Sequence, residues 1–427
     1  MWRLLAGAGL FLSRRLFGDP TLALGFERGE KVPADVVAYF ADPAARLYQL
    51  EQWLPVFERL DERHRVLLVL RDAGTYHELE GVTNLRRVLV PQFAQLTELY
   101  AENDYRVGLY VNNGSRNFQS LSHQTMLHVH ISHGESDKIS MVSNQAKAYD
   151  RVFVAGEAAI CRHRAALIGF DERKLVPIGR PQLDFVEERK AQADGRKTIL
   201  YAPTWEGENA SNNYTSVDVF GERISKAVLS LPNVRFVYKP HPRVALSRVR
   251  EMLSAHESIC RLVADAAKRE PSAGHEVALD GDILALLPAA DAMITDVSSV
   301  GLDFLYLETD KPLFVTDRRN DRDRLLAEAP VSGGADIVDR EAIPSLAATL
   351  SARLERDDHR EARERLRGFY FGDVAVGEST RLFVDAVGRL VSERDTLLAR
   401  RTAAADALTD KGARAAVMER AAAGERV

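Results

Sequence analysis

Short apolar runs alternate with amphipathic stretches along most of this chain. Between residues 60 and 180 each run is rich in β-branched side chains and bounded by charge, glycine or asparagine, which is typical of buried strands. The predicted strands are Val66–Leu70, Val88–Val90, Val107–Val111, Leu127–Ile131 and Val152–Ala155. Helical patterns, such as Phe93–Glu102 and Glu157–Ile168, lie between them. This alternation predicts a parallel sheet covered by helices on both faces.

The same pattern begins again after a break near residue 180. The sequence IGRPQLD at 178–184 contains glycine and proline, and a charged stretch follows it to Lys197, as in a linker. Beyond it we predict the strands Thr198–Tyr201, Arg235–Tyr238, Val277–Leu279, Ala292–Thr295 and Leu313–Thr316. The predicted helices are Val219–Leu229, Ala245–Ser254, Ser299–Leu307 and Ile343–Leu354. The chain therefore contains two α/β halves, and a cleft between them is the default ligand site.

This pattern divides the chain into four expected segments. Residues 1–60 form an N-terminal helical or membrane-surface segment, and residues 61–180 and 181–375 form two Rossmann-like domains. Residues 376–427 form a C-terminal helix and tail, because the sequence from about Ser392 onward is rich in alanine, arginine and glutamate and lacks aromatic residues.

The N-terminus, WRLLAGAGLFLSRRLF, has an apolar run from Leu4 to Leu12 between arginines. The run is shorter than the ~20 residues that cross a bilayer, and no small-residue cleavage site follows it. Two interpretations stay open. The segment is a helix on an anionic membrane surface, with Trp2, Leu5 and Phe11 on its apolar side, or a first helix packed on its own domain. No other stretch is long and apolar enough to predict a transmembrane helix.

Composition and charge exclude several classes of protein. With 46% hydrophobic and 28% charged residues, the chain is globular. The net charge of −5 argues against a broad nucleic-acid-binding surface, so we expect no nucleic-acid partner. Cys161 and Cys260 are the only cysteines, which argues against a disulfide framework or a thiolate zinc site and fits a reducing cytosol. Neither common glycine-rich phosphate loop is present.

The most informative polar cluster is ADAMITDVSSVGLD at 290–303, which reads as strand, turn and helix. Thr295 and Asp296 end the predicted strand, Ser298 is a good N-cap residue and Ser299 falls in the first turn. The unpaired N–H groups of a first turn attract anions, and hydroxyl groups add donors for phosphate oxygens. Simple capping by Ser298 is the alternative, but it leaves the other polar residues unexplained. We therefore favour a phosphate site.

A second strand, in VRFVYKPHPR at 234–243, runs into Lys239, His241 and Arg243. Three potential cations at one strand end suit a pyrophosphate, since arginine supplies a bidentate fork and lysine a point charge. The alternative is a solvated basic turn. In TILYAPTWEG at 198–207, Trp205 either stacks on a base or packs on a loop, and packing is the more common role.

A third strand end, in HVHISHGESDK at 128–138, carries His133 beside Gly134. His128 and His130 share one face of the strand, but the spacing places no third ligand, so we expect no metal site. A neutral imidazole can instead accept a hydroxyl proton, with Glu135 or Asp137 orienting it. A histidine satisfied within a turn remains the alternative.

Together these segments resemble the CDP-glycerol glycerophosphotransferase family, the teichoic-acid primases and polymerases. In family order they are His133-Gly134, Tyr201-Ala202-Pro203-Thr204, Lys239-Pro240-His241-Pro242 and Thr295-Asp296-Val297-Ser298-Ser299 with Asp303, within residues 125–316. The resemblance implies a GT-B fold, two Rossmann-like domains with a cleft between them, of which the second mainly holds the donor. It also implies a cytoplasmic enzyme, peripheral on the inner face of the membrane, with neither a metal nor a cofactor.

The resemblance also implies roles for the site residues. Residues 61–180 would form the acceptor domain and 181–375 the donor-nucleotide domain. His133 would be the base that deprotonates the acceptor hydroxyl, and His241 would act on the donor pyrophosphate. The other expected donor-binding residues are Lys239, Arg243, Thr295, Ser298 and Ser299, with Asp296 and Asp303 supporting their loop.

The implied reaction moves a polyol phosphate from CDP-glycerol, or a similar CDP-polyol, to a lipid-linked or polymeric glycan acceptor of the cell envelope or capsule, releasing CMP. An anionic membrane surface is the other expected partner. Two alternatives stay open. One is a nucleotide-sugar glycosyltransferase on the same scaffold, and the other is a non-catalytic binding protein, against which the presence of both His133 and His241 argues.

The chain departs from the family pattern after His133-Gly134. The family commonly continues with Thr-Pro-Leu-Lys, whereas this chain has Glu135-Ser136-Asp137-Lys138. We expect the two carboxylates to lie near the acceptor, where they would repel an acceptor phosphate. This predicts an acceptor with neutral hydroxyls next to the attacked position.

Overall fold

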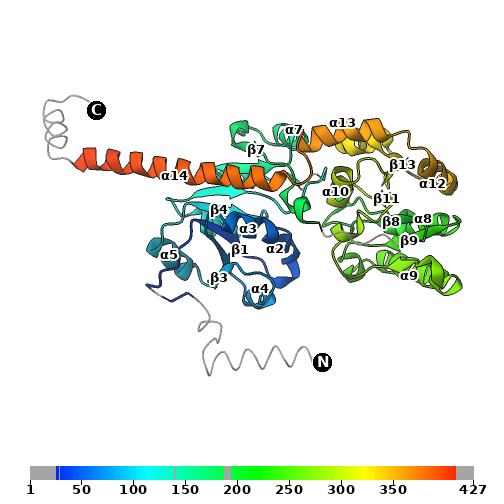
Figure 1. Ribbon diagram of the computed structural model, residues 1–427, viewed down its shortest axis with the longest axis horizontal. Coiled ribbons are helices and arrows are strands. Elements are labelled where there is room, and N and C mark those ends of the chain that lie inside the picture. Colours follow the sequence, from blue (N-terminus) through cyan, green and yellow to red (C-terminus); the bar gives the residue numbers. More distant parts are fainter. Residues whose placement is uncertain (1–25, 28, 139–140, 187–193, 410–427) are drawn as a thin grey trace, which may run out of the picture. The chain divides into compact units, whose positions relative to one another are not determined.

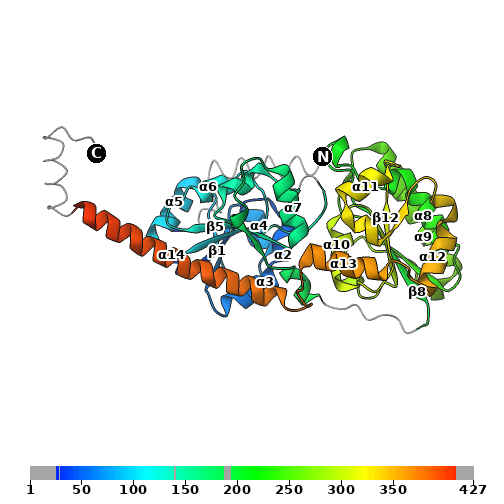
Figure 2. The ribbon, with the colours of Figure 1, turned by 90° about the horizontal axis from the view of Figure 1, so that it is seen from above.

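The computed structural model describes residues 26–27, 29–138, 141–186 and 194–409. The apolar run Leu4–Leu12, and with it the membrane-surface interpretation, lies outside these residues. The chain forms two compact α/β units (Figures 1 and 2). Unit 1 extends to His133 and includes Gln145–Phe153 and the chain from Arg381 onward, and unit 2 comprises Gly134–Asn144 and Val154–Thr380. Each unit contains a sheet of parallel strands, which confirms the predicted α/β fold class.

The first sheet has seven strands in the order β3-β2-β1-β4-β5-β6-β7. Val36–Phe40 and Val66–Leu70 are apolar and buried along their whole length, as strands covered on both faces must be. The described strand pairs are all parallel. The strands are β1 (Val36–Phe40), β2 (Val66–Leu70), β3 (Arg86–Leu89), β4 (Val107–Tyr110), β5 (Leu127–His130), β6 (Arg151–Val154) and β7 (Leu175–Pro177).

The second sheet has six strands in the order β10-β9-β8-β11-β12-β13, again with parallel pairs. In both sheets the first strand of the unit lies centrally, and the strand order reverses beside it, between β1 and β4 and between β8 and β11. The strands are β8 (Lys197–Ala202), β9 (Val234–Tyr238), β10 (Glu276–Val277), β11 (Ala292–Thr295), β12 (Leu313–Thr316) and β13 (Asp336–Val338).

Alternate residues of each central strand face opposite layers of helices. Leu200 and Ala202 belong to one core cluster of unit 2, and Ile199 and Tyr201 belong to the other. Helices α7 (Glu157–Ala166), α10 (Ser299–Leu307), α11 (Arg322–Glu328) and α13 (Arg360–Phe371) contribute to the first cluster. Helices α8 (Glu222–Leu229), α9 (Arg250–Arg269) and α12 (Leu346–Glu355) contribute to the second. Unit 1 contains α2 (Tyr48–Glu51), α3 (Leu54–Asp61), α4 (Ala73–Glu78), α5 (Phe93–Glu102) and α6 (Asn117–Leu121), and most of α14 (Ser379–Thr409).

Most predicted elements are present, some with the expected bounds. Ala292–Thr295, Leu313–Thr316, Phe93–Glu102 and Ser299–Leu307 begin and end as predicted. Three strands were not predicted: β1, which lies inside a segment expected to be helical, and the short edge strands β7 and β13. The C-terminal helix also begins at Ser379, well before the alanine-rich stretch that indicated it.

Helix α14 is tied to unit 1 by a buried aromatic cluster and by ion pairs. Phe383, fully buried, packs against Trp53, Phe57 and Phe153 with ring centroids 5.2–6.4 Å apart. Farther along the helix, Arg394 donates to the carbonyl oxygen of Thr125 at 2.7 Å and pairs with Asp104.

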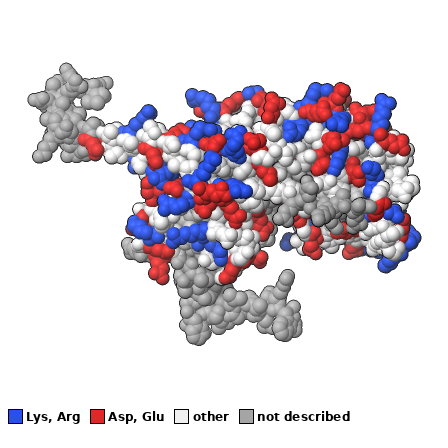
Figure 3. All heavy atoms as spheres, viewed as in Figure 1, with Lys and Arg blue, Asp and Glu red and all other residues white. Residues whose placement is uncertain are grey.

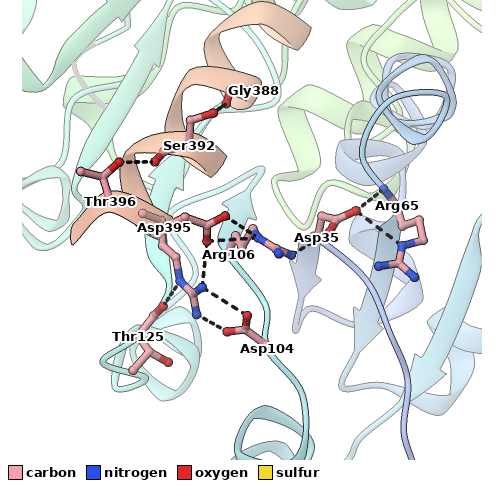
Figure 4. Close-up of polar contacts among 10 residues, drawn as sticks. Asp35, Arg65, Asp104, Arg106, Thr125, Gly388, Ser392, Asp395 and Thr396 are labelled. Carbon is pink, nitrogen blue, oxygen red and sulfur yellow. Dashed lines mark hydrogen bonds and ion pairs between the residues drawn. The ribbon is translucent and has the colours of Figure 1, made fainter. Parts of the chain in front are cut away.

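Arg106 extends this network, as Figure 4 shows. Its guanidinium lies 2.8 Å from Asp35 and 3.1 Å from Asp395 of α14. These contacts link the helix to the loops at the amino ends of β1 and β4.

The surface carries both signs of charge. Figure 3 shows acidic and basic side chains interspersed over the visible face, which fits the small net charge. Across the part of the chain that the structure describes, no helix is both long and apolar enough to cross a membrane.

The burial of Phe383 predicts that its packing contributes strongly to holding α14 on unit 1. Phe383→Ala should destabilise unit 1 by about 3–4 kcal/mol, because it leaves a cavity among three aromatic rings. Leu397→Ala, on the same helix but 45% exposed, should change stability by less than about 0.5 kcal/mol. Thermal unfolding and hydrogen exchange of α14 measure both effects. Equal melting temperatures for the two variants would contradict this packing account.

Candidate functional site

The sequence-predicted donor residues converge at the carboxyl end of the second sheet. β8 and β11 are neighbours there, and the strand order reverses between them. In open parallel sheets this reversal leaves a crevice outside the strand ends, where ligands bind. The turn after β8 carries Thr204, and the turn after β11 carries Asp296.

Asp296 joins three segments at this edge through its carboxylate. One oxygen accepts the backbone N–H of Thr204 at 2.7 Å. The other accepts the backbone N–H of Ser216 at 3.1 Å and the hydroxyl of Thr316 at 2.6 Å. Burial raises the pKa of Asp296 to about 6, and these hydrogen bonds oppose the rise. The group is therefore ionised near neutral pH, and its role is to fix the turns around the site.

The start of α10 is only half-buried, and no side chain of the described residues caps it. Ser298 is the N-cap residue, as predicted, but its side chain makes no capping hydrogen bond and lies 3.2 Å from the Thr295 hydroxyl. Ser298, Ser299 and Val300 are half-buried. The backbone N–H groups of this first turn and the positive end of the helix dipole suit an anion.

The segment after His133 reaches the same place. A Cβ added to Gly134 would lie 3.5 Å from the Cβ of Ser299, so the glycine backbone lies against the start of α10. Four residues on, the ammonium of Lys138 donates to the Thr204 hydroxyl at 2.8 Å. Burial lowers the pKa of Lys138 to about 8, while Asp296 favours its charged form. Lys138 thus adds a cation that the sequence had indicated only by its family spacing.

His241 is uncharged at neutral pH, contrary to the expectation of three cations at this strand end. Burial and the positive charges of Lys138 and Arg243 lower its pKa to about 3. Its Nδ1 accepts the backbone N–H of Arg243 at 3.1 Å. The neutral ring must then carry its proton on Nε2. His241 therefore offers a fixed N–H donor, which can bind a phosphate oxygen without a net charge.

Arg243 and Trp205 lie beside His241. The Arg243 guanidinium lies 4.3 Å from the centroid of the Trp205 ring, in a cation–π contact. The rings of Trp205 and His241 are 6.2 Å apart. Within the described chain no carboxylate pairs with Arg243, so its positive charge is not neutralised locally. Trp205 packs on a charged side chain, and this contact orients the guanidinium.

Other predicted donor-binding residues have structural contacts instead. The ammonium of Lys239 donates to the carbonyl oxygens of Leu279, Asp280 and Gly281 at 2.8–3.3 Å, which uses its three N–H groups. Thr295, fully buried, donates to the carbonyl oxygen of Ala202 at 2.9 Å.

Asp303 likewise has a structural contact. It accepts two N–H groups of the buried Arg180 at 2.7 and 3.1 Å. This pair ties α10 to the 178–184 segment, so Asp303 supports the helix.

The expectation for Glu135 and Asp137 is wrong. Both side chains are buried and pair with Arg162 of α7, Asp137 at 2.8 Å. Asp137 also accepts the hydroxyl of Tyr370 from α13. Burial raises the pKa of Asp137 to about 7. These carboxylates anchor the 134–138 segment, and they neither orient His133 nor face an acceptor.

His133 is the last residue of the first segment of unit 1, three residues beyond β5. Its Nδ1 lies 3.3 Å from the carbonyl oxygen of Val111, which can only accept, so the neutral ring keeps its lone pair on Nε2. Ser132 before it has a left-handed backbone, with φ of 55°, and its carbonyl oxygen accepts the indole N–H of Trp53 at 2.6 Å. A strained residue held in this way is typical of functional turns.

The histidines before His133 are part of the core. His128 hydrogen-bonds the Tyr110 hydroxyl at 2.7 Å and the carbonyl oxygen of His123 at 2.9 Å. His130 is also buried and lies 5.2 Å from the Tyr149 ring. Among the residues that the structure describes, no group of three or more His, Cys, Asp or Glu side chains is arranged to hold a metal ion.

Several residues that shape the site carried no signal in the sequence. Ser216 and Thr316 bind Asp296, and Arg162 binds the 134–138 segment, from elements far away in the chain. Only their polar character could have indicated them, and many surface residues share it.

Comparison with known proteins identifies the family pattern. A sequence profile described as CDP-Glycerol:Poly(glycerophosphate) glycerophosphotransferase matches residues 103–324, just over half of the chain. This segment contains His133, Lys138, His241, Arg243 and the start of α10. A comparison with curated protein sequences gives no significant match.

Solved structures support the fold. The wall teichoic acid polymerase TagF superposes with a TM-score of 0.53 at 13% identity, over 92% of this chain and 97% of that one. A UDP-GlcNAc 2-epimerase from Neisseria meningitidis, bound to UDP-GlcNAc, gives 0.54 at 13% identity over 84% and 100%. A glycosyltransferase from Rickettsia africae gives 0.51 at 11% identity over 86% and 99%. At these identities the likeness concerns the fold, and the predicted GT-B fold is confirmed.

The contacts of Asp296 predict that the carboxylate is required for the fold of this edge. In Asp296→Asn one of the two oxygens becomes an NH₂ group that faces backbone N–H donors, so unit 2 should lose about 3 kcal/mol of stability. Asp310→Asn, at an exposed position of unit 2, is the matched control and should stay within about 0.5 kcal/mol of wild type. Thermal unfolding compares them. A melting temperature of Asp296→Asn equal to that of the control would refute this role.

Proposed function

This chain belongs to the CDP-glycerol:poly(glycerophosphate) glycerophosphotransferase family, and on that premise we propose that it transfers glycerol phosphate from CDP-glycerol to a hydroxyl group of a cell-envelope or capsule polymer, with release of CMP. It would then be a transferase of the EC 2.7.8 type. One observation carries this proposal. The matched segment gathers Lys138, His241, Arg243 and the start of α10 around the Asp296 carboxylate, at the strand-order reversal of unit 2.

In this proposal unit 2 binds the donor diphosphate. The diphosphate oxygens accept the Nε2–H of His241 and the N–H groups of Ser299 and Val300 at the start of α10. Arg243 and Lys138 supply positive charge. Fixed donors and cations stabilise the charge that develops on the phosphates during transfer.

The proposed transfer is an in-line displacement at the β-phosphorus. The acceptor oxygen forms a bond to that phosphorus, and the bond from phosphorus to the bridging oxygen breaks, so the bridging oxygen leaves with CMP. His133 takes the acceptor proton on Nε2, the nitrogen that its contact with Val111 leaves with the lone pair. Gly134, next in the chain, lies against Ser299 at the start of α10.

We also propose a lipid-linked or polymeric glycan as the acceptor and a peripheral location on the cytoplasmic face of the membrane. The support for membrane contact is the apolar run Leu4–Leu12 with its flanking arginines, which lies outside the described residues. An interaction with an anionic membrane surface therefore rests on the sequence alone.

Release of CMP from CDP-glycerol is the direct test of this function. Chromatography of the nucleotides formed from CDP-glycerol, CDP-ribitol and UDP-GlcNAc, with a panel of hydroxyl acceptors, should show CMP from a CDP-polyol. His133→Ala and His241→Ala should each lower turnover by ~100-fold or more, as loss of a base or of a phosphate donor does.

His77→Ala is the matched control, because this exposed histidine lies on α4. It should keep wild-type turnover, and all three variants should retain their melting temperatures. Near-wild-type turnover of His133→Ala would remove its assignment as the base. UDP release from UDP-GlcNAc, without CMP from any CDP-polyol, would instead assign the protein to the nucleotide-sugar glycosyltransferases.

The lowered pKa of Lys138 predicts a pH dependence of donor binding. Lys138 is charged below about pH 8 and neutral above it, so affinity for CDP should fall as the pH rises through this value. The diphosphate is fully ionised over this range, and loss of one charged contact should weaken binding ~10-fold. In Lys138→Met the affinity should be low and independent of pH. Calorimetry at a series of pH values measures this, and a wild-type affinity that stays constant through pH 8 would exclude Lys138 from the site.

A further inference from the structure

Unit 1 has a polar cluster at its own strand-order reversal. Its sheet reverses order between β1 and β4, whose carboxyl ends lie side by side. Asp42 follows β1 and Asn112 follows β4. The Asn112 amide donates to Asp42 at 2.9 Å and to Gln49 at 2.8 Å. This contact joins the two strand ends, as the contact between Asp296 and Thr204 does in unit 2.

The cluster retains capacity to bind hydroxyl groups. The Asp42 carboxylate accepts one N–H from Asn112 and one from Arg46 at 3.1 Å, and a carboxylate has about four acceptor positions. Arg46 also balances the charge of Asp42, so the cluster is close to neutral. The backbone at Gly114 lies close to the Asn112 side chain, and glycine allows this close approach, since a Cβ there would lie 3.0 Å from the Asn112 side-chain oxygen.

An exposed aromatic ring lies between this cluster and His133. Tyr48 is 40% exposed, and its ring meets the His133 ring edge-on with centroids 6.3 Å apart. The Tyr48 hydroxyl accepts an N–H of Gln49 at 3.3 Å. The carbonyl oxygen of Val111 lies 3.3 Å from the Nδ1 of His133, and Val111 directly precedes Asn112 in the chain. An apolar ring face, a set of side chains that accept hydrogen bonds from hydroxyl groups, and the proposed base thus occur together.

We propose that Tyr48, Asp42, Gln49 and Asn112 form the acceptor subsite, and that it takes a ring sugar with neutral hydroxyl groups. The apolar face of a pyranose packs on an aromatic ring, while its hydroxyls donate to the carboxylate and exchange hydrogen bonds with the amides. A linear polyol has no such face, and a phosphate would meet the Asp42 carboxylate. The inference rests on the proposed function in one respect, which is the role of His133 as the base.

Kinetics with matched variants test this subsite. With N,N′-diacetylchitobiose as the acceptor, Tyr48→Ala and Asp42→Asn should raise its KM about tenfold or more, whereas Tyr48→Phe, which keeps the ring, should stay within about twofold. The KM for CDP-glycerol should be unchanged, because the proposed donor site lies in unit 2. Phe93→Ala, a similarly exposed aromatic beside the far strand β3, is the control.

Binding without donor separates this inference from the proposed function. Saturation-transfer NMR should show the disaccharide on wild type and Tyr48→Phe, and its loss from Tyr48→Ala, even if no CDP-polyol is turned over. Absence of CMP release with intact disaccharide binding would count against the proposed function alone. An unchanged disaccharide signal in Tyr48→Ala and Asp42→Asn, no signal from wild type, or a preference for glycerol 3-phosphate that these variants do not alter would overturn the subsite.

Discussion

The buried carboxylate of Asp296 is the constraint on which the donor side of this protein depends. It accepts hydrogen bonds from the turns that contain Thr204 and Ser216 and from Thr316 at the end of β12. Hydrogen bonds to a charged group contribute about 1.5–3 kcal/mol each, which offsets the cost of burying the charge. Asp296 also favours the charged form of Lys138. One carboxylate thus sets the shape of the strand-end turns and holds a cation beside them.

The same carboxylate helps to position His241, which is neutral without being inert. Thr204 is fixed by Asp296, and the backbone N–H of His241 donates to the carbonyl oxygen of the adjacent Pro203 at 3.0 Å. Burial and the positive charges of Lys138 and Arg243 lower the pKa of this histidine, which serves as a dipolar N–H donor among cations. Such a donor binds an oxyanion without adding a third charge to a crowded site.

Local patterns in the sequence predicted the fold well where strands and helices are strongly patterned. Ala292–Thr295 and Ser299–Leu307 were predicted to the residue, because a short apolar run meets a polar turn and then an apolar helix. β1 was missed although Val36–Phe40 is equally apolar, because the region before residue 60 was interpreted as helical. The sequence also indicated candidate site residues, but the contacts of these residues depend on partners that the sequence alone cannot identify.

Lys239 and Glu135 show that limit most clearly. A lysine at a strand end suggests a phosphate ligand, yet its ammonium is bound by carbonyl oxygens about 40 residues away, at Leu279–Gly281. A carboxylate after His133-Gly134 suggests an acceptor contact, yet Arg162 pairs with it inside unit 2. In both cases burial decided the role, because a buried charge must find a partner wherever the fold supplies one.

A crystal structure of the protein with bound CDP tests the central claim most directly. The account predicts that the diphosphate lies within hydrogen-bonding distance of the His241 Nε2 and of the backbone N–H groups at the start of α10, with the Asp296 contacts intact. A diphosphate bound elsewhere, or one that contacts the Lys239 ammonium in place of the 279–281 carbonyl oxygens, would contradict it.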